Sequence, residues 1–165
     1  MSRRDQIKMT DDEVVAFLGE QRCVTCATNG RDGWPHLMPL WYVVRDAGAA
    51  SPSAGGPELW AWTYAASQKV RNLERDPRAT LQVEAGEEYQ LLRGVMLKTD
   101  AIIHRETADV AALGLEIFTR HSALGRELAP EVRQMVEAQA RKRVALQFVE
   151  RERATWDHRK LGGAY

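Results

Sequence analysis

The segment with the clearest chemical potential covers residues 63–73, where a strand-like stretch ends and a helix-like stretch begins. Ser67 stands at the expected helix start, and Lys69 and Arg71 follow in its first turns. The free backbone N–H groups and the dipole of a helix N-terminus attract anions, and a hydroxyl and a lysine strengthen such a site. The segment therefore predicts an anion site whose natural occupant is a phosphate. The alternative is an ordinary capped helix in which Ser67 is the N-cap and both cations are solvated.

A second segment, residues 33–41, combines two tryptophans with a proline inside a strand-like stretch. Pro39 cannot donate a hydrogen bond to a neighbouring strand, so the strand lies at an edge or is bulged there. The backbone polar groups left unpaired beside Trp41 are then available to a flat ring. The alternative is that Trp34 and Trp41 simply pack in the core, which is more frequent for isolated tryptophans.

The C-terminal segment, residues 156–161, holds an aromatic side chain, an acid, an imidazole and two cations. Disordered tails are usually polar and lack tryptophan, so Trp156 indicates a docked tail. His158 by itself is more typical of a surface histidine than of a catalytic one.

The cysteines and histidines do not have the spacing of a metal site. Cys23 and Cys26 form a Cys-x-x-Cys pair, which is compatible with a redox pair or half of a zinc site. They fall in a predicted strand, however, where residues three apart face opposite sides. The four histidines show no ligand spacing and no second ligand pair is well placed, so we predict no metal site and two buried free thiols.

Composition is that of an ordinary globular chain. The 165 residues fit one domain, residues 1–165, and 44% of them are hydrophobic. Lys plus Arg number 23 and Asp plus Glu number 23, and this balance argues against a general binder of nucleic acid or of membrane surfaces. No apolar run reaches the roughly 20 residues of a membrane helix, and no signal peptide is visible, so we expect a cytoplasmic location.

Periodicity and turn signals predict a mostly β chain of α+β type. Strands are expected at residues 23–28, 37–45, 58–64, 78–84 and 143–150, with a long strand or bent pair at 89–104; helices are expected at 11–20, 67–76, 107–121 and from 130 onward. Residues 46–57, rich in Ala, Gly, Ser and Pro, are expected to form a surface loop. The last helix is expected to turn Val132, Met135 and Val136 inward. About six strands with few short helices favour an antiparallel barrel with the helices outside it.

Alternation within residues 58–64 assigns two faces to that strand. One face is expected to carry Leu59, Ala61 and Thr63, and the other Trp60, Trp62 and Tyr64. In the last strand, one face is expected to carry Val144, Leu146 and Phe148.

Five motifs occur in order along nearly the whole chain: Thr25-Cys26-Ala27-Thr28; Asp32-Gly33-x-Pro35-His36-x-x-Pro39-x-Trp41-Tyr42; Ser67-Gln68-Lys69-x-x-Asn72-Leu73-x-Arg75-Asp76-Pro77-Arg78; Leu92-Arg93-Gly94-Val95; and Trp156-Asp157-His158-Arg159-Lys160-Leu161. As a set they resemble the pyridoxamine 5′-phosphate oxidase-like split-barrel family. The resemblance is closer to its actinobacterial branch, which uses the deazaflavin coenzyme F420.

The resemblance implies an FMN-binding-like split β-barrel that forms a homodimer, with two cofactor sites across the subunit interface. The helix start would hold the cofactor phosphate, the tryptophan-bearing strands would border its rings, and the C-terminal tail would reach the site from the partner subunit. The implied cofactor-binding residues are Met38, Pro39, Trp41, Trp62, Thr63, Ser67, Gln68, Lys69, Val70, Arg71, Asn72, Trp156 and Arg159.

Two departures separate the chain from the FMN-dependent oxidases of that family. Those oxidases tend to have Ser-Arg-Lys where this chain has Gln68 between its serine and lysine, and Gln68 lacks the guanidinium fork that grips a phosphate monoester. The vitamin B6 oxidases end with an Arg-x-His clamp, whereas here His158 and Arg159 are adjacent.

The leading hypothesis is an F420-dependent oxidoreductase that acts on a small organic substrate. The alternatives are an FMN enzyme of the same fold and a non-catalytic protein that carries a cofactor or a tetrapyrrole; a ligand sensor built on the barrel is a fourth. The catalytic residues stay open, with His158 and Tyr42 as candidate proton donors.

Overall fold

The computed structural model describes residues 2–47, 56–122 and 128–162. Most of the loop predicted at residues 46–57 lies outside the described residues. The helices are α1 (Arg3–Gln6), α2 (Asp11–Glu20), α3 (Gln68–Arg75), α4 (Thr107–His121) and α5 (Pro130–Ala140), with 3-10 helices η1 (Tyr89–Leu91) and η2 (His158–Leu161). The strands are β1 (Cys23–Asn29), β2 (Pro35–Asp46), β3 (Pro57–Tyr64), β4 (Arg78–Ala85), β5 (Arg93–His104) and β6 (Arg143–Asp157).

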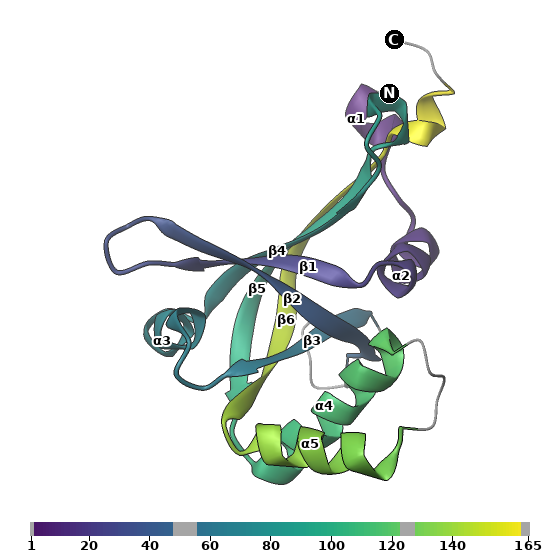
Figure 1. Ribbon diagram of the computed structural model, residues 1–165. Helices are drawn as coiled ribbons and strands as arrows, with labels where there is room; N and C mark the ends of the chain where they lie inside the picture. The colour runs from purple at the N-terminus through teal and green to yellow at the C-terminus, as the bar shows by residue number, and fades with distance from the viewer. Residues whose placement is uncertain (1, 48–55, 123–127, 163–165) are drawn as a thin grey trace.

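The six strands close into one antiparallel barrel in the order β1-β2-β3-β6-β5-β4. Pairing of β1 with β4 completes the ring. Figure 1 shows α4 and α5 packed together at one end, α3 and α2 on opposite sides, and a long β5–β6 ribbon that leads to α1 and η2. This architecture confirms the predicted split barrel with short helices outside it.

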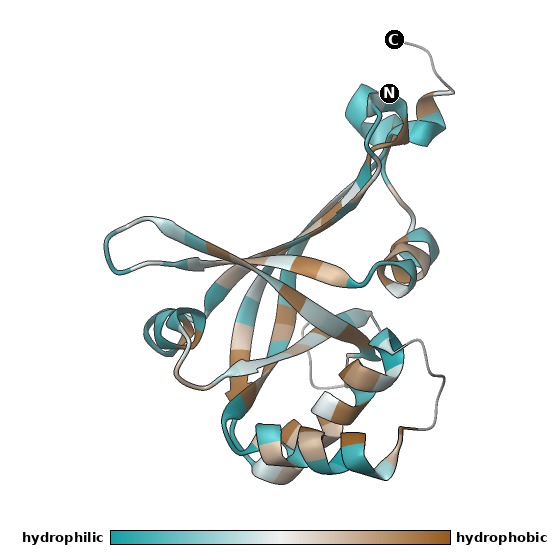
Figure 2. Ribbon diagram, viewed as in Figure 1, coloured by the Kyte–Doolittle hydropathy of each residue, from teal (hydrophilic) through white to brown (hydrophobic). Residues whose placement is uncertain are grey.

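The two faces of the strands contribute side chains to two separate hydrophobic clusters. Leu59 and Ala61 of β3 lie in the barrel interior, and Trp62 faces the other way, into a cluster with α4 and α5 that Trp60 joins from its edge. Figure 2 shows this alternation as brown and pale segments along the strands. The face predicted for the last strand also lies in the barrel interior: Val144, Leu146 and Phe148.

Four local predictions are wrong in part. β6 extends past residue 150 to Asp157, because its pairing with β5 continues to Arg93. The stretch expected as strand from residue 89 begins instead with η1. Met135 is 44% exposed, since α5 rests on α4 mainly through Val136 and Ala140. Of the two thiols, only that of Cys26 is buried, and that of Cys23 is exposed, because the two residues face opposite sides of β1.

The contact between α4 and β3 depends on Gly114. A Cβ atom at this position would lie 2.6 Å from Cζ3 of Trp62 and 2.9 Å from Cγ1 of Val136. We expect Gly114→Ala to lower the free energy of unfolding by about 1–3 kcal/mol, because α4 must move away from β3 to admit the methyl group. Urea denaturation of both proteins measures the difference.

Gly19→Ala is the matched control for this substitution. Gly19 lies in α2, and a Cβ atom there would meet nothing within 4 Å. The same change should therefore stabilise the protein by up to about 1 kcal/mol through helix propensity. If Gly114→Ala also stabilises the chain, the close approach of Trp62 does not restrict this position.

Candidate functional site: a pocket in the split of the barrel

The strands β2 and β3 pair over only part of their length, and this opens the barrel. Their ladder ends at the pair Tyr42–Ala61, beyond which β2 continues beside β1 and β3 continues beside β6. Pro39 lies in the part of β2 that has no β3 partner, and so the predicted edge position is confirmed. Figure 1 shows the two strands diverging, with α3 near the far end of β3.

A cavity of about 470 Å³ lies in this opening. It brings together predicted residues from three elements, with Pro39 and Trp41 from β2, Trp62 and Thr63 from β3, and Lys69 from α3. Three more residues complete the lining: Cys23, Leu40 and Arg143. We refer to this cavity as the split pocket.

Lys69 is a buried cation at the wall of the split pocket. The residue is only 6% exposed, and its Nζ donates a hydrogen bond to Oγ1 of Thr63 at 3.0 Å. Burial lowers the pKa of the Lys69 ammonium, and the nearby Cys26 opposes this effect. The alternative of a solvated lysine is therefore wrong for Lys69, while Arg71 on the same helix is exposed.

Ser67 occupies the N-cap position of α3 but does not cap it. No hydrogen bond links its side chain to the helix, and its buried Oγ has no partner among the described residues. Buried hydroxyls without a partner are rare in native proteins. A phosphate at this helix start would supply the missing acceptor. Lys69 lines the split pocket and Ser67 does not, so Lys69 is the residue of this pair that faces the cavity.

Arg143 also lines the split pocket, and the sequence analysis missed it. Its guanidinium lies 4.3 Å from the ring centroid of Trp62 and 4.1 Å from that of Tyr64. The buried Nε has no hydrogen-bond partner among the described residues. No local motif marks this arginine; only the pairing of Arg143 with Tyr64 across β6 and β3 places it at the site.

The other residues predicted on α3 have different surroundings. Nε2 of Gln68 donates to Oδ1 of Asn72 at 2.9 Å, and both residues line a separate cavity of about 390 Å³ next to the β1–β2 turn. Asn72 is fully buried, and its Nδ2 donates to Oγ1 of Thr28, which ties α3 to β1. Val70 is a core residue. Met38 is exposed and does not line the split pocket.

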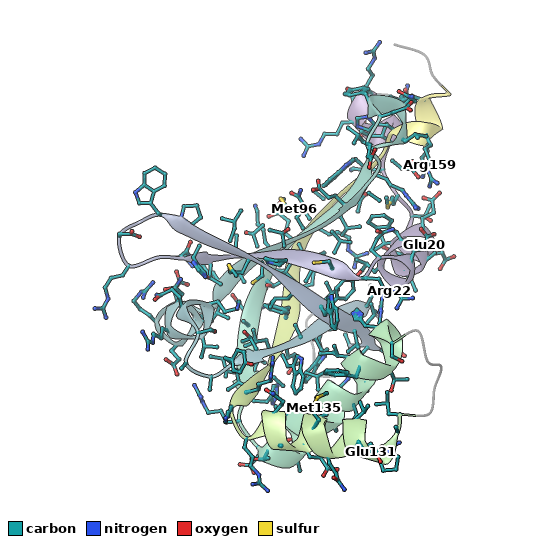
Figure 3. The ribbon with its side chains drawn as sticks, viewed as in Figure 1. Glu20, Arg22, Met96, Glu131, Met135 and Arg159 are labelled. Carbon is teal, nitrogen blue, oxygen red and sulfur yellow. The ribbon has the colours of Figure 1, made fainter. Side chains whose placement is uncertain are left out.

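Within one chain, Trp156 and Arg159 lie far from the split pocket. Trp156 packs on Gly94 of β5, where a Cβ atom would come within 2.3 Å of the indole, so the tail is docked as predicted. Arg159 pairs with Asp157 at 2.6 Å, and this pairing holds the pKa of the Asp157 carboxyl below its usual range. Figure 3 shows Arg159 at the end of the β5–β6 ribbon, on the side of the molecule away from α3.

The two candidate proton donors both make structural contacts. Tyr42 is fully buried and donates its hydroxyl to the carbonyl of Leu18 at 2.8 Å. Burial raises the pKa of Tyr42 to about 12, and its position in the barrel core makes its candidacy as a proton donor wrong. His158 contacts the carbonyl of Tyr89 through Nδ1 at 2.9 Å, away from the split pocket.

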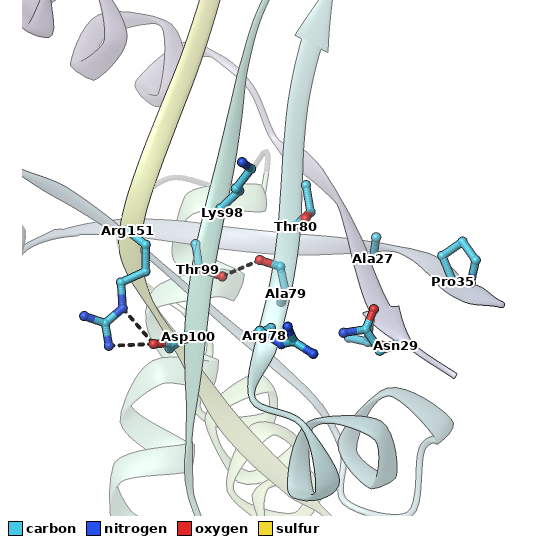
Figure 4. A pocket seen from close by; sticks show the side chains of 11 residues that line it. Ala27, Asn29, Pro35, Arg78, Ala79, Thr80, Lys98, Thr99, Asp100 and Arg151 are labelled. Carbon is cyan, nitrogen blue, oxygen red and sulfur yellow. Dashed lines mark hydrogen bonds and ion pairs between the residues drawn. The ribbon is translucent and has the colours of Figure 1, made fainter. Parts of the chain in front are cut away.

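A cavity on the outer face of β1, β4 and β5 is less suited to an anion. Its volume is about 420 Å³, but its charged groups are already paired. Nε of Arg151 donates to Asp100 at 2.7 Å, as Figure 4 shows. Arg78 donates two hydrogen bonds to the carboxylate of Asp76.

Among the residues that the structure describes, no group of three or more His, Cys, Asp or Glu is arranged to hold a metal ion. In the same residues, no helix is long and apolar enough to cross a membrane.

The closed six-stranded barrel and the pocket in its split define a split-barrel protein. Within that class, the chain belongs to the pyridoxamine 5′-phosphate oxidase family, whose model matches residues 10–157. The match covers nearly all of the chain and assigns it an oxidoreductase-type fold. No curated protein matches the chain.

Several solved structures share this fold. A conserved hypothetical protein from Mycobacterium tuberculosis is 36% identical, with a TM-score of 0.83 over 100% of this chain and 95% of that one. A protein described as an F420 reductase is 18% identical, with a TM-score of 0.59 over 84% of this chain and 93% of that one. An FAD-binding protein from Mesorhizobium loti is 15% identical, with a TM-score of 0.60 over 89% and 94% of the two chains.

Proposed function

We propose that the chain is an F420-dependent oxidoreductase that exchanges a hydride with a small organic substrate. The observation that carries the proposal is the composition of the split pocket. Two tryptophans border it and the buried cation Lys69 stands at its wall, a combination that suits a flat ring system bearing a phosphate arm. The similarity to an F420 reductase and to an FAD-binding protein supports a cofactor of the flavin type.

The residues of the chain bind and orient in this proposal. Trp41 and Trp62 border the rings and Lys69 holds the phosphate, near the start of α3 where the Ser67 hydroxyl has no partner among the described residues. Bound F420 supplies a ring that carries a hydride and reacts poorly with oxygen. No side chain of the split pocket is assigned as a proton donor, and solvent fills that role.

F420 is preferred over FMN in this proposal for two reasons. The C-terminal motif of residues 156–161 resembles the deazaflavin branch, and α3 carries Gln68 in place of an arginine. An FMN enzyme is the second candidate, because Arg143 adds a second cation to the pocket that Lys69 lines. Two cations balance the nearly double negative charge of the FMN monoester better than a single cation does.

Equilibrium titrations with F420 and with FMN separate these candidates. We expect the purified protein to bind F420 more tightly than FMN, with fluorescence as the readout. Tighter binding of FMN would transfer the assignment to the FMN enzyme, with the fold unchanged. An absorbance spectrum with a haem band in the purified protein would instead favour the tetrapyrrole carrier.

We also propose that the protein is a homodimer in which the tail of one subunit completes the site of the other. Trp156 and Arg159 reach no cofactor pocket of their own chain, so a role at the site requires a partner. Light scattering at micromolar concentration should give the mass of a dimer. A monomer would remove both tail residues from the proposed site.

A further inference from the structure

Arg143 reaches the split pocket from β6, whereas Lys69 reaches it from α3. It is the first residue of β6 and pairs with Tyr64, the last residue of β3. The neighbouring pair, Thr63 with Val144, places the hydroxyl that binds Lys69 one residue away along β3. The end of the β3–β6 ladder therefore presents Lys69 and Arg143 to the same cavity.

The guanidinium of Arg143 is held in place but is not neutralised. The rings of Trp62 and Tyr64 lie at 4.3 and 4.1 Å from its central carbon, and such stacking fixes the plane of a guanidinium. No ion pair of Arg143 with a carboxylate occurs among the described residues. Its buried Nε also lacks an acceptor there, which is an uncommon condition for a buried donor.

The split pocket is electropositive although the chain as a whole is neutral. Its lining contains the cations Lys69 and Arg143 and no aspartate or glutamate. The whole chain has 23 basic and 23 acidic residues, so this local excess of positive charge is a property of the pocket. Gln68 has a neutral side chain, which bonds to Asn72 and lines another cavity.

We propose that Arg143 is an anion-binding residue of the split pocket that, together with Lys69, makes binding depend on the phosphate of the cofactor. The fixed fork of Arg143 supplies paired donors, and Lys69 of α3 supplies a point charge to the same cavity. The site thereby selects ring systems that carry a phosphate over the same rings without one. This inference rests on the proposed use of the split pocket for a flavin-type cofactor.

Two matched ligand pairs test the inference. FMN is compared with riboflavin, and F420 is compared with its deazaflavin chromophore lacking the phosphate arm. One of these two pairs is expected to bind to the wild-type protein. For the phosphate-bearing member of that pair, FMN or F420, we expect Arg143→Gln to weaken binding about ten- to a hundredfold. Binding of the phosphate-free member should change less than about twofold, because it makes no contact that Arg143 supplies. Fluorescence titration measures all of these affinities without any turnover.

Control variants separate this role from stability and from net charge. Arg141→Gln removes the same charge two residues earlier, at an exposed position, and should leave both members of each pair unaffected. Arg143→Met keeps a long apolar stem against the two rings and should reproduce the selective loss while thermal unfolding stays unchanged. Equal losses for both members of a pair, or no loss for either, would overturn the role of Arg143.

The same titrations keep this inference distinct from the proposed function. If the wild-type protein binds the flavin pair and not the deazaflavin pair, the F420 assignment fails and Arg143 is tested on FMN and riboflavin. If it binds F420 and Arg143→Gln has no selective effect, the inference fails and the proposed function stands. A wild-type protein that binds neither pair contradicts both.

Discussion

Lys69→Met is expected to weaken cofactor binding about ten- to a hundredfold without lowering the stability of the fold. The side chain is buried at the pocket wall and has one hydrogen bond, to Thr63, so its charge is poorly compensated when the pocket is empty. A charge-assisted hydrogen bond to phosphate contributes roughly 1.5–3 kcal/mol to binding. Methionine keeps the length and packing of the stem while removing the charge. Fluorescence titration and urea denaturation measure the two effects.

The pH dependence of stability gives a second measure of the same residue. Burial lowers the pKa of Lys69 below its ordinary value of 10.5, so the folded state resists protonation of this group. This cost is fully present below the lowered pKa and disappears as pH rises through the window up to 10.5. The stability of the wild type relative to Lys69→Met should therefore increase from pH 7 toward pH 10. A difference that stays constant up to pH 10 and falls only above pH 10.5 would show that the charge of Lys69 stabilises the fold.

Arg71→Met is the matched control for Lys69. It removes one positive charge from the same helix. The family resemblance implied a binding role for Arg71, but the residue is exposed and does not line the split pocket, so we propose none for it. Affinity and stability should both stay close to those of the wild type. If Arg71→Met weakens binding as much as Lys69→Met does, the effect is one of long-range charge and not of contact with the phosphate.

Arg120→Ala is expected to lower the free energy of unfolding by about 3–5 kcal/mol. Its guanidinium donates to the carbonyls of Leu18 and Gln21, each at 2.7 Å, and contacts that of Gly19 at 3.1 Å. These carbonyls end α2 and have no partner within the helix. The guanidinium also lies 4.8 Å from the ring of Tyr42. Removing it takes the arginine donor from the carbonyls of Gly19 and Gln21 and leaves that of Leu18 with the Tyr42 hydroxyl alone.

The measurement for Arg120→Ala is urea denaturation beside the variant Arg133→Ala. Arg133 lies on the exposed side of α5, and its loss should change stability by no more than about 0.5 kcal/mol. Arg120→Lys should give an intermediate loss, because the ammonium keeps a positive charge at this junction but loses the planar stacking on the ring of Tyr42. A loss below about 1 kcal/mol for Arg120→Ala would mean that water replaces the guanidinium at this junction.

Local patterns in the sequence were sufficient for most of the elements of the barrel. Alternation placed Leu59 and Ala61 on one face of β3 and Trp62 on the other, because successive side chains of a strand face opposite sides. The structure turns the first face to the barrel interior and Trp62 to the cluster with α4. The helix that follows β3 and the edge position of Pro39 were also predictable, since each depends on a few neighbouring residues. The family resemblance is of the same kind, because its motifs are short and contiguous.

The tertiary structure alone decided which of these residues share a pocket. The β2–β3 ladder ends at Tyr42 and Ala61, and this end point creates the split that holds Trp41, Trp62 and Lys69 together. Arg143 enters the same pocket through strand pairing between residues far apart in the chain. Pairing with β5 likewise set the length of β6. The register of a strand pair and the point where its ladder ends depend on contacts between segments far apart in the chain, and so does the burial of Lys69. The residue types at neighbouring positions do not reveal those contacts.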